Sequence, residues 1–115
     1  MRIGISANGS DLAARVDGRF GRCPWFLVVD SDSLEFEAVE NRRAGEGMGA
    51  GMGAAKDLID ERVEAVISGQ VGPKAYEVLK AGDIVIFLVS DDVTVKDALE
   101  RFKRGELRKM EMRVF

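Results

Sequence analysis

The stretch VEAVISGQVGPKAYEVLKAGDIVIFLV, from Val63 to Val89, decides the fold class. It opens with a short apolar run at 63–67 and closes with a continuous one at 84–89, as expected of buried parallel strands. Between the two runs, Pro73 suits the first position of a helix and Gly82 suits the position just after its end. The stretch therefore predicts a strand–helix–strand unit with a right-handed crossover.

The first third of the chain predicts three more strands. Residues 2–7 alternate apolar with small or polar side chains, and residues 25–30 are almost entirely apolar. Residues 34–40 alternate apolar residues with glutamates, which suits a strand at the edge of a sheet. The short polar turn at 31–33 joins the second and third strands as a hairpin.

Two further helices complete the expected fold. One is predicted over residues 54–62, and another begins after Thr94 and is closed by Gly105. The segments together predict an α/β fold with a mixed five-stranded sheet and three helices. Strands one to three would form an antiparallel meander, and strands four and five would run parallel to strand one. Residues 1–107 are expected to form a single domain and 108–115 a charged C-terminal tail.

Composition limits the function. The chain has 115 residues, a single cysteine, no histidine and a formal net charge of −3. One cysteine cannot form an internal disulfide, which favours a reducing, cytoplasmic location. The mild negative charge does not suggest nucleic-acid binding, and no apolar run approaches the roughly 20 residues of a membrane span. Without histidine, the commonest metal ligand and the commonest general base are both missing.

The cysteine lies in the run Arg19-Phe20-Gly21-Arg22-Cys23-Pro24. Nearby guanidinium groups favour a thiolate, which is the form of cysteine that binds metals. Pro24 suits the first residue of a strand and would keep Cys23 in the loop outside the sheet. The other interpretation is that Cys23 is a small, inert, half-buried residue.

A second unusual segment, RRAGEGMGAGMG at 42–53, alternates glycine with other residues and follows Asn41. Regular structure is not expected there. With the predicted strand directions, this segment, Cys23 and residues 68–70 meet at one edge of the sheet, together with two helix N-termini. That edge is where α/β folds bind ligands, and helix N-termini with arginines favour an anion. The alternative is that the glycines form only a flexible connector.

The motifs of common enzymes are incomplete. The string GAGMGA at 49–54 matches a dinucleotide fingerprint, but Gln70 stands where an acidic residue would hold a ribose. No Ser or Thr follows Lys56, so no Walker A loop is present. Nuclease-like sheets place acids on their first and fourth strands to hold two divalent ions. Here the first strand has none and the fourth has only Glu64 at its start, so enzymatic activity is not expected.

From residue 1 to about 107, the chain resembles the dinitrogenase iron–molybdenum cofactor biosynthesis family. The resemblance rests on VDGRFGRCPWFLVVD at 16–30, Asn41 before the glycine-rich segment, Gly69-x-x-Gly72-Pro73-x-Ala75 and Thr94-Val95-x-x-Ala98. It implies a ribonuclease-H-like, three-layer fold without nuclease activity. It also implies binding, storage or transfer of a molybdenum-containing metal–sulfur cluster, with proteins that donate and accept the cluster. Several relatives carry histidines where this chain has Met48 and Met52, whose thioethers suit Cu(I).

We therefore predict a non-catalytic carrier of an anionic metal–sulfur cluster, similar to the iron–molybdenum cofactor or to a molybdenum–copper sulfide. The carrier is expected to be a monomer or weak homodimer. Cys23 is the predicted metal ligand. The other predicted binding residues are Arg19, Arg22, Asn41, Arg42, Arg43, Gly47, Met48, Gly49, Gly51, Met52, Gly53 and Gly69. Two alternatives stay open: a metal-free regulatory domain that binds a partner protein or small anion, and a nuclease-like enzyme.

Overall fold

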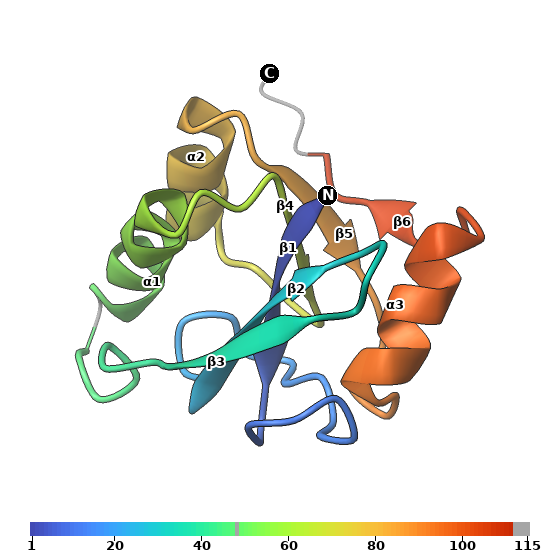
Figure 1. Ribbon diagram of the computed structural model, residues 1–115. Helices are drawn as coiled ribbons and strands as arrows, with labels where there is room; N and C mark the ends of the chain where they lie inside the picture. Colours follow the sequence, from blue (N-terminus) through green and yellow to red (C-terminus); the bar gives the residue numbers. More distant parts are fainter. Residues whose placement is uncertain (48, 112–115) are drawn as a thin grey trace.

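A single mixed sheet organises the computed structural model, which describes residues 1–47 and 49–111 (Figure 1). The elements in chain order are β1 (Arg2–Ala7), β2 (Trp25–Asp30), β3 (Phe36–Glu40), α1 (Ala50–Asp60), β4 (Ala65–Ser68), α2 (Pro73–Ala81), β5 (Val85–Leu88), α3 (Val95–Lys103) and β6 (Arg108–Lys109). The strand order is β3-β2-β1-β4-β5-β6. Strands β1 to β3 form an antiparallel meander, and β4 and β5 run parallel to β1. The predicted α/β class and strand directions are confirmed.

The prediction of five strands is wrong, because Arg108–Lys109 add a sixth strand, β6, antiparallel to β5. These two residues belong to the segment expected to be a tail. The Met110 N–H donates to the Ile86 carbonyl at 2.8 Å, and the Met110 side chain packs against the core. The pairing depends on the open backbone edge of β5, which any residue can use, so no side-chain pattern marks it.

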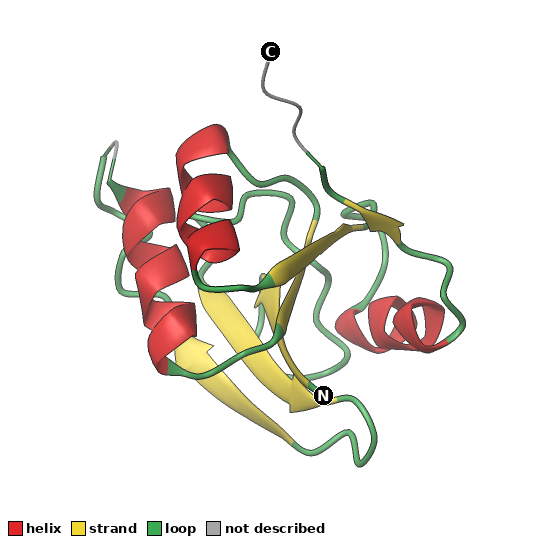
Figure 2. Cartoon of the chain, turned by 90° about the horizontal axis from the view of Figure 1, so that it is seen from above, coloured by secondary structure: helices red, strands yellow, loops and turns green. Residues whose placement is uncertain are grey.

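The sheet is covered on both faces, with α1 and α2 on one side and α3 on the other (Figure 2). The period of two in β1 separates the two cores. Ile3 and Ile5 are fully buried in the α3-side core. Gly4 faces α1, where a Cβ would lie 3.2 Å from Leu58 Cδ2, so glycine allows the helix to pack closely. Within residues 1–47 and 49–111, no helix has the length and apolar character needed to span a bilayer.

Helix α1 begins at Ala50 rather than at residue 54, so the last four residues of the glycine-rich segment, 50–53, are helical. Glycine costs about 1 kcal/mol relative to alanine in a helix interior. That cost is offset by one buried face, formed by Ala50, Ala54, Ala55 and Leu58. The prediction of a helix start at residue 54 is wrong, because the glycines at 51 and 53 hide the buried alanine face in the sequence.

Candidate functional site

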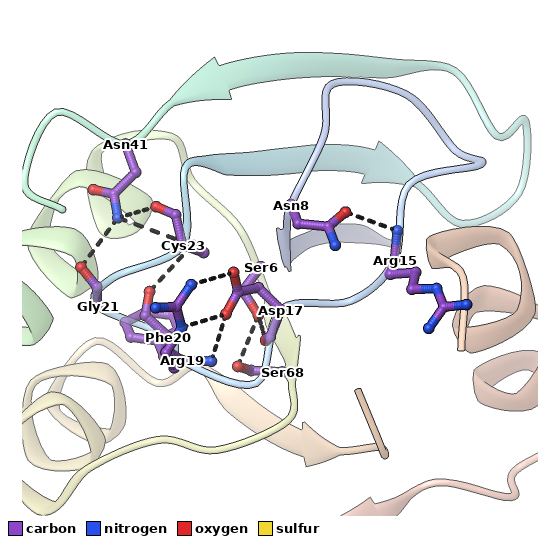
Figure 3. A network of polar contacts seen from close by, with 10 residues as sticks. All are labelled: Ser6, Asn8, Arg15, Asp17, Arg19, Phe20, Gly21, Cys23, Asn41 and Ser68. Atoms are coloured by element: carbon purple, nitrogen blue, oxygen red, sulfur yellow. Dashed lines mark hydrogen bonds and ion pairs between the residues drawn. The ribbon is translucent and has the colours of Figure 1, made fainter. Parts of the chain in front are cut away.

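Asn41 organises the loops at the edge of the sheet where β1 ends and β2 begins (Figure 3). Its side chain is 7% exposed. Its Nδ2 donates to the Cys23 carbonyl at 2.8 Å and to the Gly21 carbonyl at 3.1 Å, while Oδ1 accepts from the Arg43 N–H at 3.1 Å. One amide therefore ties the loop before β2 to the segment that follows β3, as the sequence analysis expected of this edge.

Cys23 lies beneath this edge and is fully buried. Its Sγ lies 3.3 Å from the Phe20 carbonyl oxygen and 3.9 Å from Asn41 Nδ2. Burial, assisted by the negative charge of Asp17, raises the pKa of the Cys23 thiol to about 12. The expectation that the neighbouring arginines would make it a thiolate is wrong, because desolvation outweighs their effect. Its assignment as a metal ligand stays a prediction.

Arg19 is held by a buried carboxylate. Asp17 is 7% exposed and accepts from the Arg19 backbone N–H at 2.8 Å, from its Nε at 3.2 Å and from its Nη2 at 3.1 Å. This contact raises the pKa of Arg19 above its ordinary value. Beneath the same turn, the Ser6 hydroxyl donates to the Asp17 carbonyl at 2.8 Å, and its oxygen lies 2.8 Å from Ser68 Oγ. The turn that carries Arg19 is therefore anchored to β1 and β4.

Two glycines allow backbones to approach closely at this edge. A Cβ at Gly21 would lie 2.6 Å from the Gly51 nitrogen in α1. A Cβ at Gly69 would lie 2.6 Å from the Gly18 Cα. Both contacts are with backbone atoms, which cannot swing aside as a side chain can. The loop 18–22 is therefore pressed between the first turn of α1 and the loop after β4.

These contacts shape a groove of about 690 Å³, here called the cationic groove. Its walls are loop 18–22, the first turn of α1, loop 70–72 and the first turn of α2. Its lining residues are Gly18, Arg19, Phe20, Gly21, Arg22, Gly51, Met52, Gln70, Gly72, Pro73, Lys74 and Ala75. Three of these residues are cationic, and among the described lining residues none is acidic. The groove thus presents positive charge on a largely apolar surface.

Two helix N-termini open on the cationic groove without side-chain caps. The N-cap residues of α1 and α2 are Gly49 and Gly72, and neither helix has a side-chain cap hydrogen bond. In contrast, α3 is capped by Thr94, whose Oγ1 accepts from the Asp97 N–H at 3.1 Å. First-turn N–H groups and the positive end of the helix dipole favour an anion. The groove therefore combines side-chain charge with backbone donors.

The structure divides the predicted binding residues between two grooves. Of the residues predicted for one common site, Arg19, Arg22, Gly51 and Met52 line the cationic groove. Asn41, Arg42 and Arg43 line a second groove of about 530 Å³ between β3 and α1, here called the acidic groove. Its other charged lining residues are Glu40, Glu46, Asp57, Asp60 and Glu61. This acidic lining is unsuited to an anion.

The remaining predicted residues have other positions. Arg43 makes ion pairs with Asp57 at 3.2 Å and with Glu46 at 3.4 Å. The contact with Asp57 raises the pKa of Arg43 above its ordinary value. A Cβ at Gly47 or Gly49 would meet no atom within 4 Å, whereas one at Gly53 would lie 3.0 Å from Arg43 Cδ. Gly69 packs on Gly18, as described above. The prediction for Met48 lies outside the described residues.

Lys74 is the cation that the sequence analysis missed. It is the second residue of α2, directly after Pro73, and lines the cationic groove. Proline at the first helical position had already marked this helix N-terminus, so the residue after it could have been added to the site. Among the described residues, no group of three or more histidine, cysteine, aspartate and glutamate side chains is arranged to hold a metal ion.

The raised pKa of Cys23 predicts a loss of stability in alkali. The thiol has an ordinary pKa of 9.0 in the unfolded chain and about 12 in the fold. Its contribution to stability is complete below pH 9 and is lost as the pH rises towards 12, because only the unfolded chain then releases the proton. Relative to Cys23→Ala, the wild-type free energy of unfolding should fall by about 2 kcal/mol between pH 8 and pH 10.5.

Denaturant titrations of both proteins across this pH range measure the difference, in which the other titrating groups cancel. The native thiol, which is buried and less ionised, should also react with an aromatic disulfide at least ~10-fold more slowly at pH 8 than the thiol of the unfolded chain. A pH-independent difference, together with rapid labelling of the native protein, would show an accessible, ionised cysteine instead.

Solved structures resemble this fold over nearly the whole chain. The apo form of the orange protein from Desulfovibrio gigas has a TM-score of 0.91 and 35% sequence identity, covering 95% of this chain and 92% of that one. A Thermotoga protein of the DUF35 family, described as NifB-like, has a TM-score of 0.83 and 32% identity, covering 97% of each chain.

Sequence comparison agrees. An uncharacterised protein of Methanocaldococcus jannaschii is 30% identical over 100 residues, covering 84% of each chain. The model of the family described as dinitrogenase iron–molybdenum cofactor matches residues 1–105. That match spans both glycine contacts, Asn41 and every residue that lines the cationic groove. The chain therefore belongs to the dinitrogenase iron–molybdenum cofactor family.

Proposed function

We propose that this protein binds an anionic metal–sulfur cluster in the cationic groove and stores it or carries it during cofactor biosynthesis. The cluster would be of the iron–molybdenum-cofactor type or a molybdenum–copper sulfide, and donor and acceptor proteins would deliver and remove it in the cytoplasm. The observation that carries the proposal is the groove itself, with Arg19, Arg22 and Lys74 on its walls and two uncapped helix N-termini.

The chemistry of the groove suits a sulfide-rich cargo. Sulfide-bridged clusters bring their own ligands and carry net negative charge on a large, weakly hydrated surface. Apolar walls at Met52 and Pro73 can contact such a surface, while the cations and N–H groups balance its charge. Because these contacts need no bond from a side chain to metal, they allow release to an acceptor. Buried Cys23 would then support the groove from beneath.

Lys74 supports a binding role because its position costs stability. A positive side chain in the first turn of a helix opposes the helix dipole by about 0.3–1 kcal/mol. The first turn of α2 carries no acidic residue that would offset this effect. A bound anion would relieve the repulsion.

A non-catalytic role is part of the proposal. The nuclease alternative needs acids on β1 and β4, where the structure has Ser6 and Ser68. Both serines are fully buried, and their hydroxyl oxygens lie 2.8 Å apart beneath the turn at Asp17. This arrangement leaves no carboxylate pair there for divalent ions. The ribonuclease-H-like classification, which the family resemblance implies, stays a prediction.

An anaerobic titration with tetrathiomolybdate tests the proposal, followed by absorbance and calorimetry. Lys74→Gln should weaken binding by about tenfold, because one charge-assisted contact is lost. Lys80→Gln is the matched control, since Lys80 lies in the last turn of the same helix and should leave binding unchanged. Cys23→Ala should change the affinity less than twofold if the cargo is held without the thiol.

The outcomes separate the alternatives. Failure of the wild-type protein to bind tetrathiomolybdate, alone or with Cu(I), would overturn the proposal. Equal affinity for sulfate would favour the metal-free domain that binds a small anion. Loss of binding in Cys23→Ala, in a protein that still folds, would restore Cys23 as the metal ligand predicted from sequence.

A further inference from the structure

Arg22 differs from Arg19 and Arg43 in what holds it. Arg19 pairs with Asp17 and Arg43 with Asp57, each through an ion pair of 3.1 or 3.2 Å. Among the described residues, no carboxylate lies within ion-pair distance of Arg22. Its guanidinium instead donates to two backbone carbonyls, Nη1 to Ala44 at 3.4 Å and Nη2 to Gly47 at 3.0 Å. The charge of Arg22 is therefore uncompensated by an anion.

The two carbonyls belong to the described loop 44–47, in which Gly45 and Gly47 are exposed and the Gly47 carbonyl also accepts from the Ala50 N–H at 3.4 Å. A Cβ at Gly45 or at Gly47 would meet no atom within 4 Å. Inside the loop region, the Ala44 N–H donates to the Asn41 carbonyl at 3.3 Å and the Glu46 N–H to the Arg43 carbonyl at 2.9 Å. The two hydrogen bonds from the Arg22 guanidinium thus connect loop 44–47 to loop 18–22.

Arg22 also lines the cationic groove, so an anion bound there would compete with the two carbonyls for the guanidinium donors. A guanidinium that binds an anion gains charge–charge attraction in addition to the hydrogen bond, whereas a backbone carbonyl is a neutral acceptor and therefore the weaker competitor. Resting on the function proposed above, we infer that Arg22 is a cargo-dependent tether of loop 44–47. A cluster in the groove takes over the guanidinium donors and thereby releases the loop.

This exchange of acceptors at Arg22 gives the empty protein and the loaded protein different surfaces at loop 44–47. When the groove is empty, Arg22 holds loop 44–47 to loop 18–22 through the Ala44 and Gly47 carbonyls. When it is loaded, the loop keeps the Arg43 contacts with Glu46 and Asp57 but loses its link to loop 18–22. The conformation of loop 44–47 therefore depends on whether the groove is occupied, and an acceptor protein that contacts this loop can distinguish loaded from empty molecules.

Amide hydrogen exchange measured by NMR tests the tether, with tetrathiomolybdate as the probe. In the wild-type protein, saturation with the probe should speed exchange at the Ala44 and Glu46 amides by about tenfold, as expected from the loss of a hydrogen-bonded contact of about 1.4 kcal/mol. Arg22→Lys keeps the charge but cannot span both carbonyls. Its loop should exchange rapidly even without probe, and saturation with the probe should speed that exchange no further.

Arg104→Gln is the control, because Arg104 is exposed at the end of α3, and it should match wild type in both states. Probe binding without faster exchange at 44–47 would overturn the tether while leaving the proposed function intact. Unchanged exchange in free Arg22→Lys would also overturn it. If the probe does not bind the wild-type protein, both the function and the tether fail.

Discussion

Gly21→Ala is expected to lower the free energy of unfolding by about 3 kcal/mol. The new Cβ would lie 2.6 Å from the Gly51 nitrogen and 2.7 Å from the Gly51 Cα. Both atoms belong to the backbone of α1, so relief requires either the helix or loop 18–22 to move. Because Arg19 and Arg22 lie in that loop, their positions in the cationic groove should change as well, and the affinity for tetrathiomolybdate should fall.

Gly45→Ala is the matched control. No atom lies within 4 Å of a Cβ at Gly45, so alanine should fit there and change stability by less than about 1 kcal/mol, in the stabilising direction. Guanidinium denaturation followed by circular dichroism measures both variants. Equal stability of the two alanine variants would show that loop 18–22 does not press against α1 in solution.

The sheet was predictable because its core strands follow simple periods. Alternation in β1 and continuous apolar runs in β2 and β5 marked the strands, and the glycine and proline signals marked α2. Strand β6 gave no such signal, since two charged residues pair through their backbone alone. The true start of helix α1 was not predictable from the sequence, because its first turn is rich in glycine and only tertiary packing shows that its alanine face is buried.

The site was predictable in outline but not in its balance of charges. Strand directions brought Cys23, Asn41 and the arginines towards one edge, as the structure shows for Cys23 and Asn41. Residue type could not show that the loop folds inward and buries the cysteine. Nor could it show that Asp17 and Asp57 neutralise Arg19 and Arg43, which leaves Arg22 and Lys74 as the less compensated cations of the groove.

Asn41→Asp is expected to be the other most damaging single change, with a loss of about 3 kcal/mol at neutral pH. The substitution keeps the shape of the side chain but replaces the Nδ2 donor with a second acceptor. The carbonyls of Gly21 and Cys23, which Nδ2 now reaches at 3.1 and 2.8 Å, would lose their donor and face a buried negative charge. Loop 18–22 and the segment after β3 would then separate.

The pH dependence of this variant identifies the cause. Repulsion from the two carbonyls disfavours the charged form, so the new carboxyl should have a pKa above its ordinary value of about 3.9 in the folded protein. The deficit relative to wild type should therefore shrink as the pH falls through that raised pKa, because the protonated acid regains one O–H donor. Denaturation curves of both proteins between pH 4 and pH 7 measure this recovery.

Asn8→Asp provides the control that isolates the role of the donor. Asn8 is exposed, and it uses its Oδ1, which accepts from the Arg15 N–H at 3.1 Å. A carboxylate accepts that bond equally well, so Asn8→Asp should cost less than about 0.5 kcal/mol at any pH in this range. The same chemical change thus has a large effect at Asn41 and a small one at Asn8, because the Asn41 amide donates into a buried site and the Asn8 side chain only accepts. Comparable losses at both positions would show that Asn41 does not hold the two loops together.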